Sequence, residues 1–418
     1  MPKQSVIDMR VCFRKSLIIS VFFLIALLGL APVHALKRGV PHIKLGIDRI
    51  DEYLDVFRGK RVGLITNATG YNSEGISTIS VLKEKVNLTT LFSPEHGLKG
   101  NYKEGAFIEN AKDAESNLPV YSLYGKQKKP TTDMLCNIDV LCFDIQDVGS
   151  RFYTYIYTMA YAMQACKEEG KIFVVFDRPN PISGNAVEGF VLKKEFSSFV
   201  GLYPIAQRHG MTVGELALMF NKEFGLACQL QVIPLKNWRR SSYFDDLSLI
   251  WHPTSPNIPT AETALIYSGI CLFEGCNLSV GRGTTMPFRY IGAPFIDAIL
   301  LCKKLAAENL DGVQFFPCYF TPSSSIYAQE NCEGIYIAVK NKQRFAPIKM
   351  AITIFKCLKE LYPQDFKIND VALKRCGLNL LFGNDSLAQE NVNYSKLLKD
   401  MEEEKKLFLK MRVPYLLY

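Results

Sequence analysis

The chain has 418 residues and a formal net charge of +8 at pH 7, and 48% of its residues are hydrophobic. This length predicts two domains, and the apolar content is ample for large cores. The charge is mild for a chain of this size, which argues against a dedicated nucleic-acid-binding surface.

The first 35 residues predict a secretory signal peptide that is not part of the fold. Its basic side chains come first, at Lys3, Arg10, Arg14 and Lys15. The apolar run Leu17–Leu30 is too short for a comfortable membrane span, and Val33-His34-Ala35 suits an export peptidase that cuts after Ala35. We therefore expect an exported protein, periplasmic or secreted, without a stable membrane anchor after cleavage.

Apolar runs alternate with helical patterns from residue 61 to residue 233. The runs predict strands over residues 61–66, 88–92, 140–145, 172–176 and 229–233. Helices are predicted around residues 76–82 and over residues 155–169 and 213–224, the last opened by the capping box Thr212–Glu215. Strands that alternate with helices indicate an α/β fold with a parallel sheet in a doubly wound layer.

A proline-rich stretch, residues 251–260, has little periodicity and predicts a surface loop or domain junction. After it, patterns predict helices over residues 296–309 and 348–361, strands over residues 315–320 and 334–339, and a final helix over residues 394–411. The expected domains are therefore residues 36–261 and a smaller α/β unit, residues 262–418.

Charged and amide side chains follow the carboxyl ends of four predicted strands. They are Asn67; Glu95 and His96; Asp144, Gln146, Asp147 and Arg151; and Asp177, Arg178 and Asn180. If the strands are parallel neighbours, these ends face one crevice, with Tyr155 beside it. Carboxylates and amides bind hydroxyl groups, tyrosine rings stack on sugar faces, and arginine suits an anionic substituent. The mixture therefore favours a sugar over a nucleotide.

The segment Ser93-Pro94-Glu95-His96-Gly97 is the clearest candidate for chemistry. A carboxylate beside an imidazole at a strand end is a plausible proton-transfer centre, and paired carboxylates fit glycoside hydrolysis. Each pair also has a structural interpretation: Glu95-His96 as a loop clamp, and Asp177-Arg178 as a plain salt bridge. The recurrence of charge at four strand ends favours a site.

No dinucleotide fingerprint, phosphate-binding loop or G-x-S-x-G elbow occurs in the sequence, and the histidines lack zinc-ligand spacing. We therefore expect no metal and no cofactor. Eleven of the 12 cysteines follow the predicted signal peptide, and most lie in apolar patterns typical of buried thiols. Cys271–Cys276 and Cys318–Cys332 are the pairs to check for disulfides.

A series of long motifs in fixed order resembles the exo-β-N-acetylmuramidases of the NamZ type. They include GLITNATG at residues 63–70, LFSPEHG at 91–97, LPVYSLYG at 118–125, FDIQDVG at 143–149, RFYTYI at 151–156 and DRPNP at 177–181. Further matches are VGLYPI at 200–205, RHGMT at 208–212, WRR at 238–240, SPNIPT at 255–260, and the segment from Glu274 to Thr285. The resemblance covers nearly the whole chain after residue 62.

This resemblance implies a Rossmann-like N-terminal domain and a smaller C-terminal α/β domain, with the active-site cleft between them. It implies release of N-acetylmuramic acid (MurNAc) from the non-reducing end of peptidoglycan-derived glycans, at β-1,4 MurNAc–GlcNAc bonds. The expected partners are those glycans, and not nucleic acid.

The resemblance also implies roles for particular residues. Glu95 is the expected general acid, His96 positions it, and Asp147 or Asp144 acts as base or orients the substrate. Arg151, Arg178 and Arg282 are the expected partners of the MurNAc lactyl carboxylate, and His209, Glu274 and Asn277 join the substrate-binding set. Cys276 and Val280 depart from the family pattern, which expects a Thr or another small residue and a Glu there.

Two alternatives stay open at this point. One is a non-catalytic periplasmic protein that binds muropeptides or muramyl sugars. The other is a hydrolase that cuts another bond, such as an amide of the stem peptide.

Overall fold

The computed structural model describes residues 42–102, 111–369 and 377–418. The predicted signal peptide lies outside the described residues. Across the described ranges, none of the helices combines the length and the apolar character needed to cross a membrane. From Ile43 onward the chain forms one compact unit.

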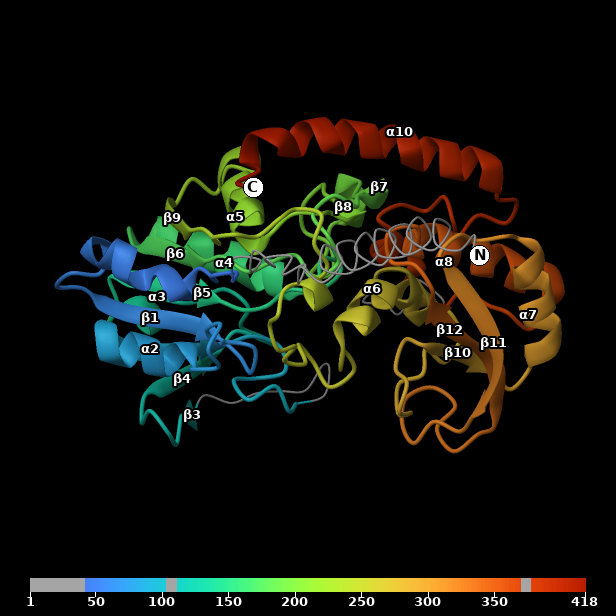
Figure 1. Cartoon of the computed structure of the whole chain (residues 1–418), viewed down its shortest axis with the longest axis horizontal. Coiled ribbons are helices and arrows are strands. Elements are labelled where there is room, and N and C mark those ends of the chain that lie inside the picture. The colour runs from blue at the N-terminus through green and yellow to red at the C-terminus, as the bar shows by residue number, and fades with distance from the viewer. Residues whose placement is uncertain (1–41, 103–110, 370–376) are drawn as a thin grey trace, which may run out of the picture. The chain divides into compact units, whose positions relative to one another are not determined.

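A seven-stranded sheet forms the centre of the N-terminal half, in the order β3-β4-β2-β1-β5-β6-β9 (Figure 1). Its strands are β1 Arg61–Thr66, β2 Asn87–Ser93, β3 Ala111–Lys112, β4 Pro119–Ser122, β5 Val140–Asp144, β6 Ile172–Phe176 and β9 Gln229–Ile233. All neighbours from β4 to β9 pair in parallel, and β3 pairs antiparallel to β4. The predicted parallel sheet is confirmed, so the carboxyl ends of β2, β1, β5 and β6 lie at one edge.

Both faces of this sheet are covered by helices, because its buried strands are apolar on both sides. The helices are η1 Ile47–Val56, α2 Thr78–Lys85, α3 Thr132–Leu135, α4 Tyr155–Glu168 and α5 Val213–Glu223. Val62 and Leu64 share one buried cluster with η1 and α2, whereas Ile65 and Phe143 share another with α4 and α5. The predicted capping box at Thr212 is present.

The C-terminal half contains a three-stranded antiparallel sheet in the order β10-β12-β11. Its strands are β10 Tyr290–Ala293, β11 Val313–Phe320 and β12 Cys332–Val339. The helices around it are α6 Ala261–Ile270, η4 Cys271–Gly275, α7 Ala298–Ala307, α8 Pro347–Leu361 and α9 Leu378–Phe382. The predicted helices and strands of this half are confirmed. Sequence analysis did not predict α6, because nearly all its residues are buried and it lacks the amphipathic stripe that marks a surface helix.

The two halves share one hydrophobic core. Phe143 of the large sheet, Ile266 of α6 and Ile335 of β12 belong to the same buried cluster. The long helix α10 Tyr394–Arg412 packs against α8 and against β7 Glu188–Val191, which pairs with β8 Ala206–Arg208 (Figure 1). Short 3-10 turns complete the described elements: η2 Lys194–Phe196, η3 Phe244–Asp246 and η6 Val413–Tyr415.

The cysteines that the structure describes are free thiols. Neither Cys271 and Cys276 nor Cys318 and Cys332 are bridged, although Cys318 and Cys332 lie on the paired strands β11 and β12. Most of these thiols are buried, as the apolar patterns around them predict.

Candidate active site

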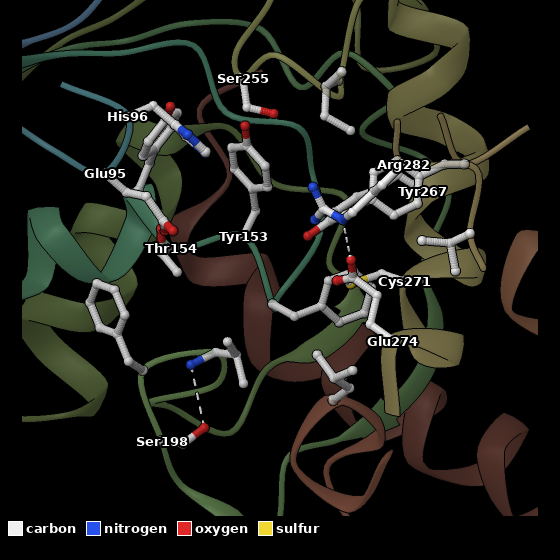
Figure 2. A pocket seen from close by; sticks show the side chains of 18 of the residues that line it. Glu95, His96, Tyr153, Thr154, Ser198, Ser255, Tyr267, Cys271, Glu274 and Arg282 are labelled. Carbon is white, nitrogen blue, oxygen red and sulfur yellow. Dashed lines mark hydrogen bonds and ion pairs between the residues drawn. The ribbon is translucent and has the colours of Figure 1, made fainter. Parts of the chain in front are cut away.

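A pocket of about 1020 Å³, called the main pocket below, lies beside the segment that follows β2. Figure 2 shows Glu95 and Thr154 on one side of it, Glu274 and Arg282 on the other, and Tyr153 between them. The lining residues come from the segment after β2, the start of α4, the loop before α6, and the region around η4. The pocket therefore joins residues from both halves of the chain.

Glu95 is half-buried at the end of the β2 segment. Its Oε2 accepts a hydrogen bond of 2.7 Å from the Thr154 hydroxyl. Thr154 is the N-cap residue of α4, yet its side chain makes no capping bond to the helix. The hydroxyl instead fixes the orientation of the Glu95 carboxylate in the pocket wall.

His96 lies beside Glu95 with a backbone φ of 69°, in the left-handed region that few residues other than glycine adopt. This backbone turn separates the two adjacent side chains. The His96 Nδ1 is 2.8 Å from the Tyr102 carbonyl oxygen. Because a carbonyl only accepts hydrogen bonds, the His96 Nδ1 is the donor in this contact.

An aromatic wall lines the main pocket between its two sides. Tyr153 packs edge-on against Tyr155 and Tyr267, with ring centroids 4.9 and 5.7 Å apart. The Tyr153 hydroxyl donates to Thr254 Oγ1 at 2.9 Å, and the Tyr155 hydroxyl donates to the Thr254 carbonyl. Burial raises the pKa of the Tyr153, Tyr155 and Tyr267 phenols, so these groups stay protonated donors. Such a wall offers apolar ring surface to a sugar.

Glu274 and Arg282 form an ion pair on the opposite wall, with Nε and Oε1 2.5 Å apart (Figure 2). The Arg282 guanidinium also lies 5.0 Å from the centroid of the Phe288 ring. Cys271 lies next to Glu274, with 3.5 Å between Sγ and Oε2. Burial raises the pKa of the Cys271 thiol well above its usual value, which leaves it neutral and a poor nucleophile.

Three cationic side chains and two carboxylates contribute to the described lining of the main pocket. The cations are Lys126, Lys128 and Arg282, and the carboxylates are Glu95 and Glu274. Lys128 Nζ lies 5.1 Å from the centroid of the Phe199 ring, a cation–π contact. The lining suits a sugar with an anionic substituent, since fixed cations stabilise such a group.

Two predicted site residues, Asp144 and Arg178, bind each other instead. Arg178 donates through Nε to Oδ1 of Asp144 at 2.5 Å and through Nη2 to Oδ2 at 2.9 Å. Both side chains are at most 5% exposed. Asp144 also accepts a hydrogen bond from the Thr78 hydroxyl. The pair thus ties the carboxyl ends of β5 and β6 together.

Arg151 is fully buried, and its guanidinium binds backbone carbonyls. It donates to Phe190 O at 2.7 Å, Ile205 O at 3.1 Å and Leu381 O at 2.9 Å. Burial lowers its pKa to about 10. The structure therefore uses this side chain to hold three distant segments together.

The loop after β5 holds another group of predicted residues beneath the surface. Asp147 Oδ2 accepts from Gly149 N at 2.7 Å and lies 3.7 Å from Nε2 of the buried His209. Gln146 donates to the carbonyls of Asp147 and Pro179. Asn180 donates to Met211 O at 3.0 Å. These side chains satisfy the loops at the sheet edge and are outside the described lining of the main pocket.

The remaining predicted residues lie apart from one another. Asp177 accepts hydrogen bonds from Gly214 N, the Thr212 hydroxyl and the Tyr418 hydroxyl. Burial raises its pKa to about 7. Asn67 lines a separate pocket of about 620 Å³. Asn277 binds the backbone of Asp365 and Lys367.

The main pocket thus brings together five of the predicted residues: Glu95, His96, Tyr155, Glu274 and Arg282. Sequence analysis did not single out Thr154, Tyr267, Lys126 or Lys128. Thr154 belongs to the quoted motif at residues 151–156, but a motif does not reveal which of its members faces a cavity. Cys276 and Val280, where the chain departs from the family pattern, also line the pocket and make that part of its wall more apolar.

Over residues 42–102, 111–369 and 377–418, no group of three or more His, Cys, Asp or Glu side chains is placed to hold a metal ion. The described lining of the main pocket offers carboxylates, an imidazole, hydroxyls and cations.

The family models described as "Exo-beta-N-acetylmuramidase NamZ, N-terminal" and "C-terminal" match residues 62–262 and 265–418. The chain is 44% identical over 384 residues to the peptidoglycan β-N-acetylmuramidase NamZ of Bacillus subtilis, a match that covers 90% of this chain and 92% of that relative.

Two solved structures of DUF1343 family proteins from Bacteroides fragilis are also similar. One has a TM-score of 0.82 and 35% sequence identity, and the other has a TM-score of 0.71 and 29% identity. Each match covers 90% of this chain and 99% of the solved chain.

Proposed function

The chain belongs to the exo-β-N-acetylmuramidase NamZ family, and we propose that it is an exo-acting glycoside hydrolase of peptidoglycan fragments. It releases MurNAc from the non-reducing end by cutting the β-1,4 bond to GlcNAc. The identity to a peptidoglycan β-N-acetylmuramidase over most of both chains supports this reaction. The single structural observation that carries it is the oriented Glu95 carboxylate in the main pocket.

Glu95 acts as the general acid that protonates the leaving glycosidic oxygen. Its half-buried position and its hydrogen bond from Thr154 hold one carboxylate at a defined place beside the aromatic wall. A general acid must reach the scissile oxygen within hydrogen-bonding distance, so a fixed carboxylate at the pocket wall meets the first requirement of the reaction.

His96 positions Glu95 and offers Nε2 for a hydrogen bond with a substrate hydroxyl. Its Nδ1 bond to the Tyr102 carbonyl fixes the ring, and its left-handed backbone sets the direction of the preceding carboxylate. Asp147 was predicted as a second catalytic group. It bonds Gly149 N and lies outside the described lining of the main pocket, so we assign it to the support of the loop.

Lys126 and Lys128 of the main pocket bind the lactyl carboxylate of the released MurNAc. Arg282 is held by Glu274 and by the Phe288 ring, so its guanidinium is oriented before substrate arrives, and it faces the leaving-group part of the glycan. We do not extend this role to Arg151 and Arg178, because backbone carbonyls and Asp144 occupy their guanidinium groups.

The substrate implies a location outside the cytoplasmic membrane. Peptidoglycan fragments occur there, and residues 1–35 have the pattern of an export signal. We propose that the chain is exported and that residues 36–261 form the catalytic domain, with residues 262–418 closing the pocket through Glu274 and Arg282.

The decisive experiment uses a MurNAc-GlcNAc disaccharide and its GlcNAc-MurNAc counterpart, with products identified by mass spectrometry. Release of MurNAc from the first substrate alone is expected. Glu95→Gln should abolish hydrolysis but retain substrate binding, whereas Glu74→Gln, at an exposed carboxylate, should match the wild type. Saturable binding by wild-type protein without MurNAc release would instead identify a muramyl-sugar-binding protein.

A further inference from the structure

A second pocket of about 680 Å³, called the side pocket below, adjoins the main pocket. Arg282 lines both of them. Two other chain segments also pass from one to the other. In one segment, Ser255 lines the main pocket and Asn257 lines the side pocket. In the other, Ile326 lines the main pocket and Ser324 lines the side pocket. The same three segments therefore form walls of both pockets, and a ligand that fills the main pocket can continue past Arg282.

The side pocket has a preformed backbone frame. Gly283 has a φ of 77°, and a Cβ there would lie 2.6 Å from Ser324 N. Its carbonyl accepts hydrogen bonds from Ser323 N at 2.9 Å and from the Ser323 hydroxyl at 2.8 Å. These hydrogen bonds join the loop around Gly283 to the loop after β11, so the walls of the side pocket are fixed relative to each other.

The lining of the side pocket suits pyranose rings. Tyr290 and Phe320 form a stacked pair with ring centroids 5.5 Å apart. The side chains of Thr285 and Asn257 are in the same lining. Among the described lining residues, Arg282 is the one with a formal charge. Flat aromatic surface beside uncharged hydrogen-bonding groups matches the faces and hydroxyls of a sugar.

The volume of the main pocket indicates which part of a glycan reaches the side pocket. Its 1020 Å³ is at the upper end of the range of about 300–1,000 Å³ that small-ligand pockets span, so it accommodates a disaccharide. Sugars beyond the first MurNAc-GlcNAc unit must leave the main pocket, and the side pocket, which shares Arg282 with it, offers the rings of Tyr290 and Phe320.

We propose that the side pocket binds the continuing glycan chain on the leaving-group side, so that the enzyme prefers glycans longer than a disaccharide. This inference rests on the proposed function and adds the length of the substrate to it. Binding energy from the remote sugars then contributes to kcat/KM, although those sugars take no part in bond cleavage.

The test compares a MurNAc-GlcNAc disaccharide with the MurNAc-GlcNAc-MurNAc-GlcNAc tetrasaccharide. Both begin with MurNAc, and one cleavage of the tetrasaccharide leaves a trisaccharide that begins with GlcNAc, so each chain releases a single MurNAc. The measured quantity is the ratio of kcat/KM for the tetrasaccharide to kcat/KM for the disaccharide. In the wild type this ratio is expected to exceed one clearly.

Phe320→Ala should lower that ratio about tenfold, the loss typical of truncating one anchoring aromatic contact. Thr285→Trp supplies a second variant, because Thr285 is exposed and a bulky side chain there fills the side pocket without disturbing the core. The matched control is Tyr319→Ala. Tyr319 is 62% exposed and, next to Phe320 in β11, points to the opposite face of the strand.

A wild-type ratio near one, or a ratio that neither Phe320→Ala nor Thr285→Trp changes, would overturn this proposal while leaving the proposed function intact. Wild-type protein that releases no MurNAc from either substrate would overturn the proposed function, and this inference with it. A fall in the ratio with Tyr319→Ala equal to that with Phe320→Ala would also count against the side pocket.

Discussion

The Tyr418 hydroxyl donates a hydrogen bond of 2.7 Å to Oδ2 of Asp177, the residue that follows β6. The same hydroxyl accepts a hydrogen bond of 2.6 Å from Leu235 N. Tyr418 follows α10 and η6, so this contact ties the end of the helical segment to the edge of the large sheet. A strand-end carboxylate that resembles a substrate ligand in sequence is thus occupied by the protein's own side chains.

Tyr418→Phe is expected to lower the free energy of unfolding by about 1–3 kcal/mol, because it removes one hydrogen bond from the buried Asp177 carboxylate and leaves Leu235 N–H without its partner. Urea unfolding followed by fluorescence measures this change. Tyr319→Phe, at a 62% exposed tyrosine, is the matched control and should not shift the midpoint. Equal midpoints for the two variants would show that the Tyr418 contact contributes nothing.

Asp177 should make the protein less stable as the pH rises through the mildly acidic range. Burial is the largest cause that raises its pKa from 3.8 to about 7. Between these values the folded state binds more protons than the unfolded state, so the contribution of Asp177 to stability is present below pH 3.8 and is lost as the pH rises to about 7. Asp177→Asn cannot titrate and should flatten this decline.

The measurement is the free energy of unfolding in urea at several values between about pH 4 and about pH 7. Asp311→Asn, at an exposed aspartate, serves as the control and should retain the wild-type slope. If Asp177→Asn and the wild type fall with the same slope, Asp177 is not the group responsible.

Arg178→Met should destabilise the fold by about 3–5 kcal/mol, since it leaves the buried Asp144 carboxylate without its cation. Adding Asp144→Asn in the same chain should recover much of this loss, because the buried charge is then gone. The exposed pair Arg58–Asp55 offers a control: Arg58→Met should cost less than about 1 kcal/mol. A variant with full stability but no activity would return Arg178 to the substrate-binding set.

Substitutions of His96 should separate its backbone role from the role of its ring. Asparagine tolerates a φ of 69°, whereas valine is strained there, so His96→Val should cost about 1–2 kcal/mol of stability more than His96→Asn. Both variants lack the ring and should lower kcat for MurNAc release roughly tenfold to a hundredfold through a misplaced Glu95.

Thermal unfolding and separate determination of kcat and KM test the two parts of this prediction. His96→Asn that is stable and fully active would assign the residue to the loop conformation alone. A rise in KM at unchanged kcat would place His96 in substrate binding and not in the positioning of Glu95.

Local patterns determined much of this fold. Alternating apolar strands and helices predicted the parallel order around β1, β5 and β6, because a strand buried on both faces must be apolar throughout. The capping box at Thr212 could also be predicted, because its partner, Glu215, is only three residues away in the sequence. Glu95 could also be predicted as a site residue, since it lies just beyond the end of a strand in a parallel sheet.

Tertiary structure alone decided which strand-end charges line a pocket and which hold the protein together. Arg178 donates a hydrogen bond to Asp144, which is 34 positions away in the sequence. Arg151 donates one to the Leu381 carbonyl, which is 230 positions away. Aspartate and arginine suit a sugar and a buried ion pair equally well, so residue type cannot separate the two uses. Burial and long-range partners distinguish a substrate-binding residue from a structural one, and a local sequence pattern encodes neither. In the folded chain Glu95 lines the pocket, whereas Asp144 and Arg151 are buried.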